Sequence, residues 1–592
     1  MDFSRFYNKV QSILDIELPS GASIIKDGCR MAEYIKIGRT AFMDKMGVDS
    51  ELAYKRQCIK NKQIMYHAHI GMNTWPDTVE ALTLLYKTAE ESGFTVDRAG
   101  ICLDRRMALP KNLRDQIPAE TGPELNTPLQ WQQVGQVVPI QPHMGDFMIG
   151  FPASVDNTVQ ALKAGVTTIG NLSQFFAHEV PMWTDKAATT VETVKAISIM
   201  GAKKNKGTLV HSYLEDGFPA LFQDCATVAG WAFLEKYIVQ DLLNAKLSHC
   251  IGGLTSDPLK RAAWVFTLNE IHDHDCIGSM IYGDTISFGA DFNRNRGLIA
   301  EYLLWDIMTQ LECPTGNAVL PLPVSEALRI PSAQEIVEAQ SFGRRIEETA
   351  RRLWPYIDFT PAYDLSAKLY AAGKSVFNNA IDGLKEVKID INDPIQMLYV
   401  LKMLGPDDFE EMFGVGKAGQ DSSRRREPLF PTDIFELSQK AINETKHIFN
   451  NSRSRDRLDG HKFLIASTDV HAHAITIIHE LLSGAGAKIT NLGAEINPDQ
   501  IAGAAKSCEA QTILISTHNG MALEYANRLK TELEKQMVDI PVVMGGVLNQ
   551  KTDDAALPVD VTIDLKKLGF YPVPKLGAGF QHLLEHQVIP KK

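Results

Sequence analysis

Short apolar runs alternate with helix-length amphipathic segments from about residue 61 to residue 345. This alternation is typical of strand and helix pairs in a parallel sheet. The eight runs are IMYHAHI (64–70), RAGICLD (98–104), FMIGFP (147–152), VTTIGN (166–171), TLVHSY (208–213), SHCIGG (248–253), IGSMIY (277–282) and AVLPLP (318–323). Eight such pairs in about 280 residues have the count and length of a (β/α)8 barrel, or TIM barrel. A doubly wound open sheet is the alternative, although it usually has fewer strands.

A second alternation begins near residue 461. Its five apolar runs are KFLIAS (462–467), AKITNLG (487–493), TILIST (512–517), PVVMGG (541–546) and VDVTID (559–564). Five strands joined by crossover helices predict a small doubly wound α/β domain of the Rossmann-like, flavodoxin-like type. The ligand of such a domain lies outside the carboxyl ends of the strands, so the residues at those ends are the candidates for binding.

The pattern divides the chain into four parts. Residues 1–60 are expected to form an N-terminal helical extension, 61–345 the barrel, 346–455 a helical region with a linker, and 456–592 the C-terminal domain. The linker is assigned to 414–428, because Gly, Ser and charged residues are typical of exposed connectors. A chain of 592 residues is also too long for a single hydrophobic core.

Composition narrows the classes of function. The net charge of −12 argues against nucleic acid as a partner, since phosphate binding needs a clustered basic surface. No run of about 18 apolar residues is present, so no membrane span is expected. The N-terminal segment lacks the basic and apolar stretches of a secretory signal. None of the eight cysteines forms a CxxC pair, which favours a reducing cytoplasm over a disulfide or zinc framework.

Three motifs stand at the strand ends of the C-terminal domain. They are Asp469 and His471 after the first strand, Ser516 and Thr517 at the end of the third, and Gly545 and Gly546 at the end of the fourth. In this order they resemble the cobalamin-binding domains of base-off, His-on mutases and of methionine synthase. The chain departs from that pattern at Ala474 and His518, and neither change removes a ligand. A plain flavodoxin-like domain, with the Asp and His as a surface pair, is the alternative.

The resemblance implies a role for each of these residues. His471 gives a neutral imidazole nitrogen to cobalt, and Asp469 accepts the proton of the other ring nitrogen, which fixes the tautomer. Ser516, with Thr517 beside it, binds the displaced nucleotide tail of the cofactor. The two glycines let the backbone approach that tail without a Cβ clash.

The segment after the last barrel strand carries a second resemblance. VLPLPVSEALRIPS (319–332) is similar to the large subunit of glutamate mutase, including a Glu-Ala-x-x-Ile-Pro core. The resemblance assigns to Glu326 a contact with the ribose of the adenosyl group, while Leu322 replaces the family's nearby lysine. The order of the two domains in one chain resembles 2-methyleneglutarate mutase. Together these features imply an adenosylcobalamin-dependent carbon-skeleton mutase, an isomerase that works by radical chemistry.

Substrate-binding residues are expected at inward and strand-end positions of the barrel. Arg105 and Arg106 directly follow a strand and are the candidate carboxylate anchors, because a guanidinium group matches a carboxylate bidentately. The other candidates are strand residues, namely Asn171 for substrate binding and His69, His211 and Tyr213 for catalysis together with Arg105. Each position also fits a structural role, as a salt bridge at a strand end or a core histidine.

The resemblance also argues about the substrate. Glutamate mutase grips its substrate with three arginines and a catalytic glutamate. The chain retains one of these arginines, near Arg105, whereas His69, Gly150 and Gly170 stand at the other positions. The sequence therefore predicts a different small carboxylic or amino acid, for example one like 2-methyleneglutarate.

Three other functions stay open from the sequence. An aminomutase would also use pyridoxal phosphate and a Schiff-base lysine, for which Lys566 and Lys567 are available. A methylcobalamin-dependent methyltransferase would carry a helical cap, which the helices at 335–450 could mimic. A cobalamin sensor would need a DNA-binding module, and no basic helix-turn-helix is visible. A homodimer or higher homo-oligomer is the expected assembly.

Overall fold

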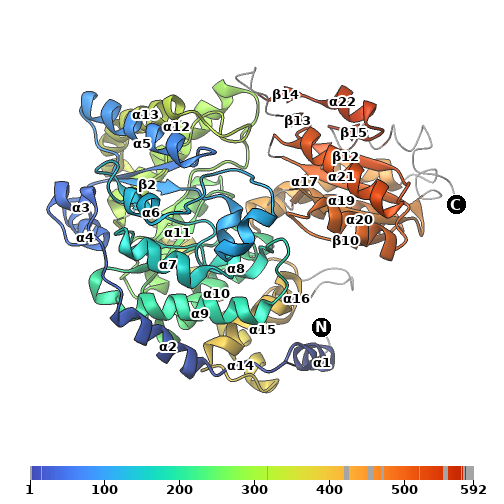
Figure 1. The fold of residues 1–592 in the computed structure, drawn as a ribbon, viewed down its shortest axis with the longest axis horizontal. Helices are drawn as coiled ribbons and strands as arrows, with labels where there is room; N and C mark the ends of the chain where they lie inside the picture. The colour runs from blue at the N-terminus through green and yellow to red at the C-terminus, as the bar shows by residue number, and fades with distance from the viewer. Residues whose placement is uncertain are drawn as a thin grey trace. The chain divides into compact units, whose positions relative to one another are not determined.

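A computed structural model describes residues 3–14, 16–316, 318–418, 426–450, 458–468, 473–518, 520–550 and 558–574, with the single residues 577 and 581 (Figure 1). The chain separates into two compact units. The first comprises Met1–Val324 and Ile330–Thr432, and the second comprises Ser325–Arg329 and Asp433–Lys592. Each unit contains one of the two alternating patterns of the sequence.

Helices precede the first strand. They are α1 (Phe3–Ile13), α2 (Gly21–Glu33), α3 (Ala41–Met46) and α4 (Glu51–Asn61). The hydroxyls of Thr40 and Ser50 cap α3 and α4 by accepting a hydrogen bond from the backbone N–H three residues further on. Glu51 and Lys55 of α4 are buried. The last of these helices therefore contributes charged groups to the core.

Parallel strands form two sheets in the first unit. One sheet has the order β3-β2-β1-β8 and the other β4-β5-β6-β7. The bounds are β1 (Met65–Ile70), β2 (Arg98–Ile101), β3 (Gln141–His143), β4 (Thr168–Ile169), β5 (Leu209–Tyr213), β6 (Leu247–Ile251), β7 (Met280–Ile281) and β8 (Ala318–Val319). A parallel bridge between Met144 and Ile169 links β3 to β4, whereas no ladder within the described ranges links β7 to β8. The structure thus shows a parallel α/β fold, but a closed barrel is not shown.

Helices connect these strands, because parallel neighbours require a crossover. The α-helices are α5 (Trp75–Glu91), α6 (Pro128–Val134), α7 (Ser154–Lys163), α8 (Ser173–Ala177), α9 (Lys186–Ala202), α10 (Cys225–Lys236), α11 (Pro258–Ile271), α12 (Phe292–Glu312) and α13 (Ala333–Leu353). The short helical turns are η1 (Arg105–Ala108), η2 (Lys111–Gln116), η3 (Lys204–Lys206), η4 (Pro219–Leu221), η5 (Tyr237–Leu242) and η6 (Trp354–Tyr356). Proline occupies the first turn of α5, α6 and α11, where its missing N–H is not needed.

The first unit ends with α14 (Thr360–Glu386), α15 (Pro394–Leu404) and α16 (Pro406–Phe413). Helix α14 packs against α10 and α11. At the crossing with α10, a Cβ on Gly230 would lie 2.5 Å from Val376 Cγ1, and one on Gly373 would lie 2.5 Å from Ala229 Cβ. Two glycines therefore set how closely the helices approach.

The second unit contains one parallel sheet with the order β10-β9-β11-β12-β15. Its strands are β9 (Lys462–Ser467), β10 (Lys488–Asn491), β11 (Thr512–Thr517), β12 (Val542–Gly546) and β15 (Tyr571–Val573), with a separate antiparallel pair β13 (Asn549–Gln550) and β14 (Val559–Asp560). Its helices are α17 (Asp433–Asn450), α19 (His473–Gly484), α20 (Pro498–Ser507), α21 (Ala522–Gln536) and α22 (Thr562–Lys567). This strand order, 2-1-3-4-5 along the chain, is the flavodoxin-like one.

Alternating strand residues build a core on each face of this sheet. Leu464 and Ala466 of β9 pack with residues of α20, α21 and α22. Phe463 and Ile465 of the same strand pack with residues of α17 and α19. Successive side chains of a strand point to opposite faces, so one apolar strand serves both layers.

Two of the expected strands are wrong. The run 147–152 is a buried irregular segment, and the third strand is instead β3, whose polar residues Gln141 and His143 are buried. The run 559–564 holds the short β14 and the start of α22, and the fifth strand of the sheet is β15. Within the described ranges, no helix combines the length and the apolar character needed to cross a membrane.

Candidate functional sites

The carboxyl ends of three neighbouring strands in the second unit carry small residues in register. Ser467 of β9 pairs with Ser516 of β11, and Ser516 pairs with Gly545 of β12. Both serines are buried. Strands β10 and β11 flank β9 on opposite sides, so the direction of strand order reverses beside β9. Doubly wound domains bind ligands at such a topological switch point. Short side chains therefore line the expected binding edge.

Glycine is required at the end of β12. Gly546 has a φ of +94°, which L side chains rarely adopt. A Cβ there would lie 2.3 Å from the carbonyl oxygen of Thr517, its partner in register. A Cβ on Gly545 would lie 3.1 Å from the carbonyl oxygen of Val573. The strand ends thus approach closely because side chains are missing at this edge.

Thr517 adds a buried hydroxyl to the same edge. Its side chain is fully buried, and Oγ1 has no hydrogen-bond partner within the described ranges. Leaving a buried polar group unsatisfied costs about 1–3 kcal/mol, so a ligand that bonds to it would be favoured. The nucleotide tail of a cobalamin is rich in hydroxyl and phosphate oxygens. Serine and threonine hydroxyls beside glycines fit such a tail in both size and chemistry.

The other residues expected to bind the cofactor are Asp469, His471 and Glu326. Asp469 and His471, the expected cobalt-binding pair, lie outside the described residues. The backbone N–H of Thr468, the last described residue before Asp469, donates to the carbonyl of Ser516 over 2.9 Å. Glu326, expected to contact the adenosyl ribose, is half-buried and lies in the segment Ser325–Arg329 of the second unit.

Four imidazole rings gather on one face of the strands of the first unit. They belong to His67 and His69 of β1, His143 of β3 and His211 of β5. Ring centroids are 5.3 Å apart for His67 and His69, 6.0 Å for His67 and His143, and 5.0 Å for His143 and His211. Adjacent strands lie about 4.8 Å apart. Rings from β1 and β3, two strands apart, therefore lean toward each other across β2.

Glycines on the intervening strands make room for these rings. A Cβ on Gly100 of β2 would lie 2.6 Å from His69 Cδ2 and 2.8 Å from His67 Nε2. A Cβ on Gly170, directly after β4, would lie 3.1 Å from His211 Nδ1. Large residues on alternate strands form a common layer in barrel interiors. Gly100 and Gly170 leave space for rings from β1 and β5 on one face of the strands.

His69 and Tyr213, two of the expected catalytic residues, are connected through Tyr282. The Tyr282 hydroxyl lies 2.7 Å from His69 Nδ1, and the Tyr282 ring centroid lies 5.2 Å from that of Tyr213. Burial, and then the charge of Arg98, lowers the pKa of His69 to about 4. Burial also holds the pKa of Tyr213 well above its usual value. This group therefore offers uncharged hydrogen-bonding groups.

The structure distinguishes the two candidate arginines. Arg106 pairs with Asp104 at 2.8 Å and with Glu124 at 3.3 Å. Arg105 is 7% exposed and makes only 3.4 Å contacts, to Glu120 Oε1 and to the Glu179 carbonyl, and its Nε has no hydrogen-bond partner within the described ranges. Arg105 thus has hydrogen-bonding capacity for a ligand, whereas the guanidinium group of Arg106 is engaged by carboxylates.

Asn171 serves the local structure. Its Oδ1 accepts from the Tyr213 backbone N–H over 2.8 Å and from the Ser173 hydroxyl over 2.7 Å. Its Nδ2 donates to Asp216 Oδ2 over 2.6 Å. The side chain therefore positions the end of β5 and the carboxylate that follows it.

A pair of carboxylates escaped the sequence analysis. Asp146 follows β3 and Asp216 follows β5. Burial, and then the charge of Asp216, raises the pKa of Asp146 to about 6, while Gln174 donates to its Oδ1 over 3.1 Å. Because the sequence placed a strand at 147–152, Asp146 seemed to precede a strand. Its position after β3 would have marked it as a strand-end residue.

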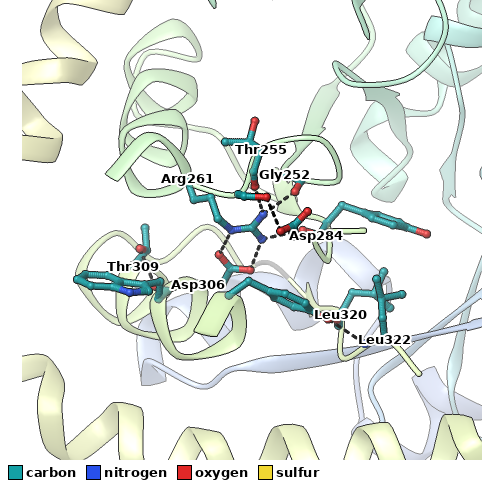
Figure 2. Close-up of polar contacts among 12 residues, drawn as sticks. Gly252, Thr255, Arg261, Asp284, Asp306, Thr309, Leu320 and Leu322 are labelled. Atoms are coloured by element: carbon teal, nitrogen blue, oxygen red, sulfur yellow. Dashed lines mark hydrogen bonds and ion pairs between the residues drawn. The ribbon is translucent and has the colours of Figure 1, made fainter. Parts of the chain in front are cut away.

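Arg261 of α11 makes polar contacts with Asp306 and with the backbone at Gly252 and Thr255 (Figure 2). Its Nε and Nη2 donate to Asp306 of α12 over 2.9 and 2.6 Å. The same guanidinium group donates to the carbonyls of Gly252 and Thr255, which follow β6 (Figure 2). It also donates to the carbonyl of Tyr282, which follows β7. One buried ion pair therefore holds together two strand-end loops and a helix.

The lysines available for a Schiff base are poorly placed. Lys566 is exposed, and Lys567 is exposed and pairs with Asp564 at 2.7 Å. Lys402 of α15, which the sequence analysis did not single out, is buried, and burial lowers its pKa to about 8. Its ammonium group donates to the Phe175 carbonyl. The structure thus gives no support to a pyridoxal phosphate site at Lys566 or Lys567.

One family model matches within the second unit. The B12 binding domain family matches residues 465–564, which include all three strand-end motifs. The chain is 34% identical over 84 residues to glutamate mutase sigma subunit 1 of Haloarcula marismortui, a match that covers 14% of this chain and 56% of that protein. It is 30% identical over 118 residues to the glutamate mutase sigma subunit of Halobacterium salinarum, which covers 20% of this chain and 77% of that protein.

The matches are limited in extent. The chain spans just over half the length of the first of these sigma subunits. A cobalamin-binding protein of Desulfitobacterium hafniense of known structure aligns over 50% of this chain and 98% of its own, at 13% identity and a TM-score of 0.18, which is too low to indicate a shared fold. Through its C-terminal part, the chain belongs to the family of the glutamate mutase sigma subunits and carries a B12 binding domain.

Proposed function

We propose that the chain is an adenosylcobalamin-dependent isomerase that rearranges a small carboxylic acid. The observation that carries the proposal is the edge formed by Ser467, Ser516 and Gly545, with the buried Thr517 hydroxyl, inside the stretch that matches the B12 binding family. The similarity to glutamate mutase subunits supports an isomerase. The likeness of the Glu326 segment to the glutamate mutase large subunit supports the adenosyl form.

Residues of the second unit would hold the cofactor. His471 ligates cobalt, and Asp469 accepts the proton on the other ring nitrogen. The hydroxyls of Ser516 and Thr517 bond to the nucleotide tail, and the glycines at the end of β12 let it approach the backbone. Glu326 bonds to the adenosyl ribose. Adenosylcobalamin, when bound, supplies the radical chemistry that protein side chains lack.

The first unit would bind the substrate. Its eight parallel strands are proposed to form a barrel within residues 61–345, and the contacts of imidazole rings across β2 and β4 support this curvature. A barrel places its chemistry at the carboxyl ends of the strands, where walls exclude water. Tyr213, Tyr282 and Arg105 all lie at or after such ends.

Specific side chains would orient the substrate. Arg105 binds a carboxylate, because its buried guanidinium group is held only by long contacts. His69 and Tyr213 line the reacting part with uncharged polar groups. His211, two positions before Tyr213 on β5, adds an uncharged imidazole at the inner end of this site. Arg106 and Asn171 act indirectly, by holding the loops after β2 and β4 in place.

The cofactor assignment is tested by reconstitution. The full chain is incubated with adenosylcobalamin and desalted, and its visible absorbance is recorded. The wild-type protein and His479→Ala, a change at an exposed histidine of α19, should retain colour, whereas His471→Ala should lose it. Colour retained equally by both variants would rule out the assigned cobalt ligand.

The reaction class is tested with substrates. A panel of small dicarboxylates and amino acids, including 2-methyleneglutarate, is added to the reconstituted protein. A true substrate should produce a Co(II) signal in the electron paramagnetic resonance spectrum and release 5′-deoxyadenosine on quenching. Methyl transfer without 5′-deoxyadenosine would replace the proposal with a methyltransferase. Sedimentation of the same sample tests the expected homodimer or higher homo-oligomer.

A further inference from the structure

The imidazole rings of His67 and His211, two of the four on the strands of the first unit, are deeply buried. His67 is 1% exposed and His211 is 7% exposed. Nδ1 of His67 and both ring nitrogens of His211 have no hydrogen-bond partner among the residues that the structure describes. Buried polar atoms are normally bonded, so these nitrogens mark a place suited to a polar group of a ligand.

Two buried basic side chains, Lys55 and Arg98, interact with these rings. Lys55 Nζ and Arg98 Nε lie 3.1 and 3.2 Å from the same oxygen, Glu51 Oε1, and all three side chains are at most 2% exposed. Over the described ranges, Glu51 is the one carboxylate at ion-pair distance from either cation. Arg98 and Lys55 thus share one Glu51 oxygen, while burial lowers the pKa of Lys55 and the Asp97 carboxylate also interacts with Lys55. Because buried charge is expensive unless it is compensated, an anionic ligand would be favoured nearby.

The two rings are suited to meet an anion. Burial, and then the charge of Arg98, holds the pKa of both His67 and His211 well below the usual value, so each is neutral and keeps one N–H donor. His143 differs, because its Nδ1 donates to the Thr168 carbonyl over 3.0 Å and leaves Nε2 as an acceptor. His143 therefore borders the place rather than donating to an anion.

The free nitrogens lie deeper than the proposed reacting part of the site. His67 precedes His69 by two positions on β1, and His211 precedes Tyr213 by two positions on β5. Residues two apart share a face of a strand and lie about 6.6 Å apart along it. A small acid held near His69 and Tyr213 would therefore reach the deeper histidines with one end.

We propose that His67 and His211 form a subsite for a carboxylate at the inner end of the substrate, with Arg98 supplying the compensating charge. The inference rests on the proposed function. It requires a substrate with a carboxylate at the end that lies near His67 and His211. An ammonium group at this end would meet like charge. A neutral group would leave Arg98 with only the Glu51 carboxylate that it shares with Lys55 among the described residues.

The test uses three ligands of equal chain length. Full-length protein labelled with ¹⁵N-histidine is titrated with glutarate, 1,5-pentanediol and 1,5-diaminopentane, and the imidazole resonances are followed by NMR. Glutarate should shift the resonances of His67 and His211, and the diol and the diamine should not. Equal shifts with the diol, or glutarate binding that leaves both resonances unmoved, would overturn the subsite.

Variants give an independent measure. In calorimetric titrations, His211→Phe keeps a ring but no nitrogen and should weaken glutarate binding about tenfold. His274→Asn, at an exposed histidine, should leave binding unchanged. Circular dichroism reports folding of each variant, and the wild-type NMR titration stands if His211→Phe does not fold.

Retention of cobalamin by the same samples separates the two proposals. Protein that fails to retain cobalamin but shows the glutarate shifts would refute the proposed function and leave the carboxylate subsite supported. Protein that retains cobalamin without those shifts would refute the carboxylate subsite and leave the proposed cofactor supported.

Discussion

In the second unit, the polar groups at the strand ends are hydroxyls of Ser467, Ser516 and Thr517, set beside glycines. In the first unit, the corresponding groups are imidazole, phenol and guanidinium groups, such as those of His69 and Arg105. The site in the second unit is formed largely by backbone and short side chains, at positions where larger side chains would clash. The site in the first unit depends on which hydrogen-bond or ion-pair partner each long side chain contacts.

The two kinds of site differ in how the sequence records them. A close backbone approach requires glycine at a fixed position, as at Gly546, and this requirement is visible in the sequence. Arg105 and Arg106 are adjacent and identical in type, yet carboxylates engage Arg106 closely and Arg105 only at long distance. The close partner of Arg106 is Asp104, two residues before it, and the backbone of the turn after β2 decides which of the two arginines this carboxylate meets. That choice is visible only in the fold.

The largest expected effect concerns the long side chains of the first unit. Asp306→Asn removes the charge that pairs with buried Arg261, and breaking a buried pair in this way costs about 3–5 kcal/mol. All seven tryptophans lie in the first unit, so the loss should appear in urea unfolding followed by tryptophan fluorescence. Glu348→Gln, in an exposed pair with Arg345, is the control and should change the unfolding free energy by less than about 0.5 kcal/mol. Similar midpoints for both variants would mean that Arg261 does not hold the loops.

A smaller effect is expected at the backbone edge of the second unit. Gly546→Ala combines a disfavoured φ with a Cβ 2.3 Å from a carbonyl oxygen and should destabilise the unit by about 2–4 kcal/mol. Gly569→Ala is the matched control, because its φ is +91° and no atom lies within 4 Å of the new Cβ. Thermal unfolding and cobalamin retention are measured for both. If the two variants behave alike, backbone strain alone explains the glycine and the close approach is unimportant.

The sequence predicted much of the second unit. Strands β9 and β11 lie where the apolar runs 462–467 and 512–517 placed them, because a buried parallel strand is a continuous apolar run. The strand at 559–564 was wrong, since the true edge strand β15 has only three residues and begins at an exposed tyrosine. A strand so short and exposed has too little apolar pattern to recognise.

The sequence predicted less of the first unit's site. Strand β3 was missed because its buried residues are polar, with Gln141 accepting from the Thr40 hydroxyl over 2.9 Å. The apolar run 147–152 is instead buried as an irregular segment, with Met148, Ile149 and Phe151 at most 1% exposed. His69, His211 and Tyr213 were found at strand positions, but their contacts depend on strands that are distant in sequence. Pattern alone does not determine such contacts.

An effect of pH should separate the two units further. Burial and Asp216 raise the pKa of Asp146 to about 6, whereas an unfolded carboxyl group ionises near 3.8. Between these values the unfolded state has lost the proton that the folded state retains, so the stability of the first unit falls as pH rises through this window. Asp146→Asn should therefore raise the free energy of unfolding by about 1 kcal/mol at pH 8, after allowance for solvent screening. At pH 3.5 the same change should have little effect. Unfolding curves at both pH values, read by tryptophan fluorescence, measure the difference, and a gain of equal size at both would exclude a titrating Asp146.

The smallest effect on stability is expected at Thr517, where the comparison of the two units is sharpest. Thr517→Val keeps the shape of the side chain and removes a buried hydroxyl that has no partner within the described ranges. The apoprotein should therefore change by less than about 0.5 kcal/mol or become more stable, because no protein hydrogen bond is lost. Cobalamin binding should nevertheless weaken about tenfold if this hydroxyl bonds to the nucleotide tail. Equilibrium dialysis with cobalamin and thermal unfolding without it measure the two effects.

Thr531→Val is the control, because it changes an exposed residue of α21 and should alter neither the stability nor the affinity for cobalamin. Thr512→Val is a poor control, because the Thr512 hydroxyl bonds to buried His461 over 3.0 Å. Stability lost together with affinity in Thr517→Val would show that the Thr517 hydroxyl serves the protein's own structure, as the long side chains of the first unit do.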